Sequence, residues 1–96
     1  MQKGYWVSCY RKIDDVGKLA AYAALAKPAI KSQGGQLLVR GTAVYASGSG
    51  LKERTVIVEW PTLDAAQAAY ESEAYQAALV ALSDGVDRDF RIIEGT

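Results

Sequence analysis

Arg40 and Glu59 are two charged side chains that the sequence places inside otherwise apolar segments. Arg40 interrupts GGQLLVRGTAVY, residues 34–45, and Glu59 comes near the end of RTVIVEW, residues 54–60. A guanidinium can bind a carboxylate or enolate oxygen, and a desolvated carboxylate can act as a base. Together they could stabilise an anion and remove a proton from an acidic carbon without a cofactor. They could equally form a structural ion pair, since buried charges occur mainly when they are paired.

The alternation of residues along these segments predicts how the two strands pair. The odd-numbered residues of 37–45 and the even-numbered residues of 56–60 are apolar or small. If these two sets face the same side, Arg40 lies opposite Glu59 on the other side of the sheet. Thr42 shares that side with Arg40. We therefore expect Arg40, Glu59 and Thr42 to lie together on the face turned away from the helices.

Tyr70 and Tyr75 are the remaining candidates for chemistry. They lie on either side of Ser72, which is expected to interrupt a helix and to cap its second part. A phenol at the mouth of a cavity could donate a proton or a hydrogen bond. The alternative is packing in the core with the hydroxyl group reaching the surface. The candidate acid/base groups are thus Glu59 and Tyr75, and the candidate ligand-binding residues are Arg40, Thr42, Glu59, Tyr70 and Tyr75.

The composition argues against several function classes. Histidine is absent and Cys9 is the only cysteine, which disfavours histidine-assisted nucleophiles, imidazole metal sites and internal disulfides. Eleven basic residues balance eleven acidic ones, so no positive field favours nucleic acid or anionic membranes. No apolar run approaches the roughly 18 residues of a membrane span. We expect a cytoplasmic protein without a metal, a cofactor, a nucleic-acid partner or a membrane anchor.

The order of elements predicts the fold. A strand over residues 4–11 precedes a helix that begins at Asp14 or Asp15 and ends at Gly34 and Gly35. The two strands containing Arg40 and Glu59 follow, then an interrupted helix capped by Thr62, and a last strand over residues 88–94. This βαββαβ order is typical of an α+β, ferredoxin-like fold with a four-stranded antiparallel sheet and both helices on one face. We expect residues 1–96 to form one domain.

The sheet face without helices is expected to be half apolar. Ile57, Leu38 and Val44 share it with the charged candidates in the predicted register. Such a face usually marks an interface or a ligand site. Two copies packed face to face would complete the core of so short a chain. The sequence therefore predicts a homodimer with a cavity between the two sheets. Either side of the first strand is compatible with lining this cavity.

An ordered set of short motifs resembles a known family. The set comprises Pro28, GG at 34–35, RG at 40–41, EWP at 59–61, AA at 65–66 and the pattern Y-x-S-x-x-YQ over residues 70–76. It resembles the domain-of-unknown-function thirteen-thirty family, over about residues 5–95. That family belongs to the dimeric α/β-barrel superfamily, whose members include cofactor-independent monooxygenases and muconolactone isomerases. The resemblance implies a homodimeric α/β barrel and transfers no catalytic role.

Two functions are consistent with these residues. In the first, the protein binds a small anionic or aromatic molecule in the cavity, and Arg40 holds its anionic group. In the second, it is a cofactor-independent enzyme, monooxygenase- or isomerase-like, in which Glu59 or a tyrosine acts as acid or base and Arg40 stabilises the anion. The absence of histidine slightly favours the first.

Overall fold

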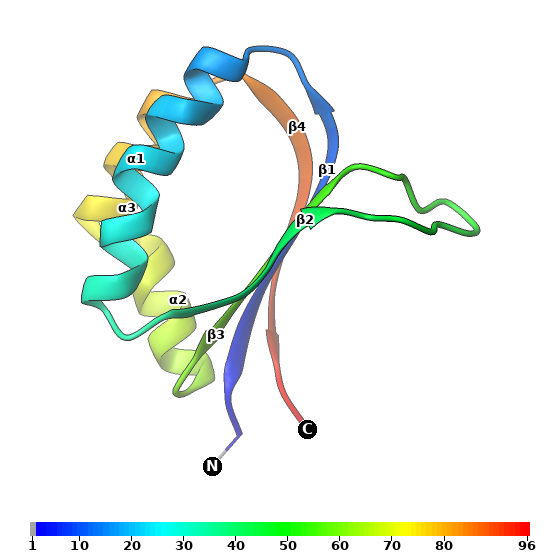
Figure 1. Ribbon diagram of the computed structural model, residues 1–96. Helices are drawn as coiled ribbons and strands as arrows, with labels where there is room; N and C mark the ends of the chain where they lie inside the picture. The colour runs from blue at the N-terminus through cyan, green and yellow to red at the C-terminus, as the bar shows by residue number, and fades with distance from the viewer. Residues whose placement is uncertain (1) are drawn as a thin grey trace.

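The computed structural model describes residues 2–96. Its elements follow the predicted order, with the second helix divided into two parts (Figure 1). They are β1 (Gly4–Ile13), α1 (Val16–Ser32), β2 (Gln36–Thr42), β3 (Arg54–Trp60), α2 (Leu63–Glu71), α3 (Glu73–Leu82) and β4 (Val86–Glu94).

Side-chain caps fix where the three helices begin. The Asp15 carboxylate accepts a hydrogen bond from the Lys18 amide at 3.0 Å, which satisfies a free donor in the first turn of α1. The Thr62 hydroxyl accepts from the Ala65 amide in the same way at the start of α2. Ser72 ends α2 in an extended conformation and caps α3. The predicted interruption at Ser72 is confirmed.

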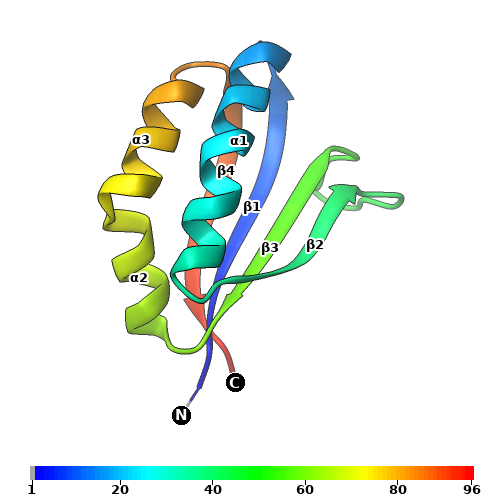
Figure 2. The same cartoon turned by 60° about the vertical axis from the view of Figure 1, so that its left-hand side comes forward.

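The four strands form one antiparallel sheet in the order β2-β3-β1-β4. All three helices lie on one face of this sheet (Figure 1). From the side of the helices, α1 lies beside α2 and α3 (Figure 2). This arrangement confirms the predicted ferredoxin-like fold.

The core lies between the helices and the inner side of β1 and β3. The tilted rings of Trp6 and Trp60 pack with 4.8 Å between their centroids, and Tyr75 packs on Trp6 at 4.6 Å. These three aromatic residues are at most 2% exposed. Because neighbouring residues of a strand point to opposite faces, the burial of Trp6 and Trp60 places Tyr5 and Glu59 on the outer face.

The predicted register between β2 and β3 is wrong along the whole strand pair. Glu59 pairs with Gln36 and not with Arg40, and a β-bulge between Leu37 and Val39 then shifts the pairing by one residue, so that Arg40 lies opposite Val56. A shift of one residue moves all the following side chains to the other face. Arg40 therefore lies on the face of the helices, and the predicted ion pair with Glu59 does not form.

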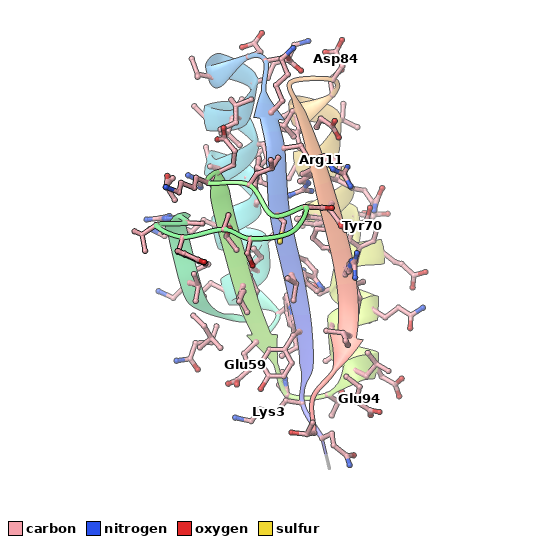
Figure 3. The ribbon with its side chains drawn as sticks, turned by 90° about the vertical axis from the view of Figure 1, so that its right-hand side faces the viewer. Lys3, Arg11, Glu59, Tyr70, Asp84 and Glu94 are labelled. Carbon is pink, nitrogen blue, oxygen red and sulfur yellow. The ribbon has the colours of Figure 1, made fainter. Side chains whose placement is uncertain are left out.

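The outer face of the sheet has no helix over it. Figure 3 views this face directly, with the helices behind the sheet and the connection between β2 and β3 in front of it. Val7 pairs with Ile57, and Ile57 pairs with Val39, which places three apolar residues at its centre. The predicted apolar outer face is thus present, although Leu38 is the extra residue of the bulge and Val44 lies beyond the end of β2.

Candidate functional site

A cavity of about 340 Å³ lies between α1 and the inner face of the sheet, and we call it the α1 cavity. It exists because α1 packs chiefly against α3 and makes few close contacts with the sheet. The side of α1 that lines the cavity carries the small residues Ala23 and Ala26, which do not fill the space. The volume is at the lower end of the range for ligand pockets.

The floor of the α1 cavity comes from β1 and β3. Trp6 and Val58 are paired neighbours at the apolar end, and Leu37 pairs with Val58 from β2. Ile30 lines this end from α1. The apolar part of a small molecule could therefore lie against an aromatic ring and aliphatic side chains at this end.

Cations that have no carboxylate partner collect around the α1 cavity. Six Lys and Arg residues form no ion pair within residues 2–96, and all of them except Lys52 line the cavity. None of the cavity residues is an aspartate or glutamate. The chain is neutral overall, yet this cavity has a strongly positive lining. The five lining cations are Lys27, Lys31, Arg40, Arg54 and Arg88.

Arg88 is held on the inner face of β4 by hydroxyl groups. Its Nη1 atom donates to the Ser8 hydroxyl and to the Tyr22 hydroxyl, each at 3.3 Å, and its Nη2 atom donates to the Tyr75 hydroxyl at 3.1 Å. The hydroxyl oxygens of Tyr22 and Tyr75 are 2.7 Å apart. The guanidinium is thus fixed in position while its charge is not neutralised.

The environment keeps Tyr75 and Arg88 in their protonated forms. Burial first, and then the neighbouring Tyr22, raise the pKa of the Tyr75 phenol well above its ordinary value. Burial alone would lower the pKa of Arg88, but its contacts with Tyr22 and Tyr75 outweigh burial and raise it. Tyr75 is therefore a hydrogen-bonding support for Arg88 and is poorly suited to release a proton near neutral pH.

Glu59 lies away from the α1 cavity, on the outer face, beside Lys3 (Figure 3). Its Oε1 atom is 3.1 Å from the Lys3 Nζ atom, and its Oε2 atom accepts a hydrogen bond from the Tyr5 hydroxyl at 3.0 Å. These two contacts lower the pKa of the Glu59 carboxyl. The side chain is therefore ionised and engaged, which is a poor state for a general base.

The other predicted candidates are dispersed. Arg40 lines the α1 cavity, whereas Thr42 is exposed at the end of β2 and is not part of the lining. Tyr70 packs in the aromatic core, with its ring 5.4 Å from that of Tyr75 and 5.2 Å from that of Phe90. Of the five predicted ligand-binding residues, the structure brings only Arg40 to this cavity.

The hydrogen-bonding residues Arg54, Arg88 and Tyr22 of the α1 cavity were not among the predicted candidates. Arg54 comes two residues before Val56, and Arg88 comes two residues before Phe90. Because residues two apart in a strand share a face, both arginines lie on the inner face with these apolar residues. That signal was available in the sequence. Tyr22 had no such signal, because its role depends on the position of α1 relative to β4.

Metal-binding clusters and membrane-spanning helices are both absent from the part of the chain that the structure describes. Residues 2–96 contain no group of three or more histidine, cysteine or acidic side chains able to hold a metal ion. Within the same range, no helix combines the length and the apolar character needed to cross a bilayer.

The comparison with protein families identifies the chain. Residues 3–96 match the family described as Domain of unknown function (DUF1330), and the protein belongs to this family. The resemblance noted from the short motifs is thereby confirmed. The family has no assigned function, and no curated protein matches the sequence.

Solved structures share the fold at low sequence identity. A protein of unknown function from Rhodopseudomonas palustris superposes with a TM-score of 0.78 at 15% identity, covering 99% of this chain and 83% of the other. A dimeric ferredoxin-like protein of unknown function from Thermobifida fusca gives 0.64 at 15% identity, covering 97% and 91%. SnoaB, a cofactor-independent oxygenase from Streptomyces nogalater, gives 0.62 at 12% identity, covering 100% and 95%. These similarities support the fold.

Proposed function

We propose that this protein binds a small anionic molecule with an apolar body in the α1 cavity. The observation that carries the proposal is the set of five cations without carboxylate partners around an otherwise largely apolar cavity. Unpaired charges next to one another in a partly buried site repel and are costly, so an anion that entered would be bound favourably. Arg40 keeps its predicted role, in a cavity on the other face of the sheet.

A cavity-filling variant tests this proposal. Ala23 lines the α1 cavity, whereas Ala24 is exposed on the same helix, so Ala23→Leu and Ala24→Leu form a matched pair. We expect a panel of small aromatic carboxylates and sulfonates to bind the parent and Ala24→Leu, with binding to Ala23→Leu at least about tenfold weaker. Isothermal titration calorimetry measures the affinities. No binding to the parent, or equal binding to both variants, would refute the proposal.

A cofactor-independent enzyme is the second candidate function. Similarity in fold to a cofactor-independent oxygenase favours it, as does a cavity in which a guanidinium could stabilise an enolate. Glu59 lies on the opposite face, so the acid/base group would have to be another side chain, such as Tyr22, or come from the substrate. Loss of an observed turnover in Tyr22→Phe, with ligand affinity retained, would support this candidate; unchanged turnover would exclude Tyr22.

We also propose that two copies pack through their outer sheet faces. Val7, Val39 and Ile57 form the centre of such an interface. The exposed side chains of Tyr45 and Leu51 stand on the connection that projects from the same face (Figure 3). The dimeric state of the Thermobifida fusca protein supports this arrangement. A cavity between the two sheets and a cytoplasmic location stay predictions from the sequence.

A further inference from the structure

Two of the five cations of the α1 cavity, Arg54 and Arg88, lie together at one end. Tyr10 pairs with Arg88 in β4, and Arg54 is its neighbour on β3, because Cys9 pairs with Thr55. The Cζ atoms of Arg54 and Arg88 lie 5.7 Å and 5.8 Å from the centroid of the Tyr10 ring. Two guanidinium groups therefore lie near one aromatic ring, at the end of the cavity opposite Leu37 and Ile30.

Arg54 has unused hydrogen-bonding capacity. Its Nε atom is buried and has no hydrogen-bond partner within residues 2–96, and its side chain forms no ion pair there. Arg91, on the outer face, shows the usual arrangement: its Nε and Nη2 atoms each donate to the Asp89 carboxylate at 3.1 Å. Leaving a buried donor of a charged group unsatisfied destabilises a protein, so the missing acceptor points to a ligand.

The strands that line the opposite end present apolar side chains, while Lys31 and Gln36, the sequence neighbours of Ile30 and Leu37, also line the cavity. Trp6, Val58 and Leu37 form adjacent positions across three strands there, and Ile30 faces them from α1. A flat ring would find an aromatic surface at this end and guanidinium groups at the other. A volume of about 340 Å³ fits one ring with its substituents better than an extended chain or a nucleotide.

We infer that the ligand is a single-ring aromatic carboxylate whose carboxylate group lies between Arg54 and Arg88 and whose ring lies on Trp6 and Val58. This inference depends on the function proposed above. It adds the chemical class of the ligand and its direction, which means the end of the cavity that its carboxylate occupies. Guanidinium groups suit planar carboxylates because their donors form a fork that matches the two oxygens. Lys27, Lys31 and Arg40 then serve as exposed cations that attract the anion.

The class of ligand is tested with four simple compounds. Benzoate has the ring and the charge, benzyl alcohol has the ring alone, acetate has the charge alone, and inorganic phosphate is a tetrahedral anion. We expect calorimetric titration of the full-length protein to detect benzoate binding at least about tenfold tighter than binding of the other three. Equal or tighter binding of phosphate or benzyl alcohol would overturn the inferred class.

The direction of the ligand is tested with Arg54→Met, and Lys52→Met is the matched control because Lys52 is unpaired but lies outside the cavity. We expect Arg54→Met to weaken benzoate binding by about tenfold to a hundredfold and Lys52→Met to leave it unchanged. Arg54→Met should melt no lower than the parent, since it removes an unsatisfied buried donor. A clearly lower melting temperature would make Arg54 structural and overturn the inference.

The results separate this inference from the proposed function. If benzoate binds the parent, fails to bind Ala23→Leu and binds Arg54→Met normally, the α1 cavity holds an anion but the inferred direction is wrong. If no anionic compound binds the parent, the proposed function fails and the inference fails with it.

Discussion

Replacing Tyr75 by phenylalanine tests the hydroxyl network behind the α1 cavity. The Tyr75 side chain is fully buried, and its hydroxyl oxygen accepts from Arg88 at 3.1 Å and lies 2.7 Å from the Tyr22 hydroxyl. Phenylalanine keeps the ring and its packing on Trp6, so the loss is limited to these hydrogen bonds. A bond to a charged group contributes about 1.5 to 3 kcal/mol and a neutral one about 0.5 to 1.5 kcal/mol. We expect the free energy of unfolding to fall by about 2 to 4 kcal/mol.

Urea denaturation of four proteins measures this loss and its origin. The parent, Tyr75→Phe, Tyr22→Phe and the double variant form a double-mutant cycle. Because both single variants lose the contact between the two hydroxyl groups, the double variant should lose about 0.5 to 1.5 kcal/mol less than the sum of the two. Tyr45→Phe is the control, since Tyr45 is 79% exposed and should show no change. Additive losses, or a loss below about 0.5 kcal/mol for Tyr75→Phe, would refute the network.

Two further predictions concern the outer face. Lys3 and Tyr5 lower the pKa of the Glu59 carboxyl in the folded state. The contribution of Glu59 to stability is therefore complete above the ordinary glutamate pKa of about 4.3, and it is lost as the pH falls through the lower pKa of the folded state. Glu59→Gln should therefore show a flatter loss of stability than the parent below about pH 4.3 in acid titrations followed by circular dichroism; identical slopes would contradict this. Ile57→Asp should sediment as a monomer while the control Val80→Asp, on an exposed part of α3, sediments as a dimer; a dimeric Ile57→Asp would exclude the proposed interface.

The sequence predicted those parts of the fold that depend on local chemistry. The caps at Asp15, Thr62 and Ser72 were readable because short polar side chains precede helical patterns there. The strand RTVIVEW was predicted with its observed bounds, residues 54–60, since β-branched residues alternate up to Trp60 and Pro61 follows. Element order and the ferredoxin-like topology followed from these signals.

The site was predicted less well, for two physical reasons. Strand alternation assumes an unbroken pleat, and the bulge at Leu38 breaks it without a glycine or proline to announce it. The predicted face of Arg40 failed on that assumption, and its pairing with Glu59 failed as well because Gln36 occupies that register position. The cavity itself depends on the distance of α1 from the sheet, which results from packing against α3 and leaves no local pattern in the sequence.

The extra residue in β2 makes the chemistry of the cavity depend on chain length as well as on residue type. Deleting Leu38 would restore the unbroken pleat and return Arg40 to the side of Glu59, withdrawing one cation from the lining without any substitution. An insertion or deletion of a single codon in this edge strand would therefore change the charge of the cavity lining and the outer face together. Two proteins that differ only by this one residue would in this way present different charges to the same cavity.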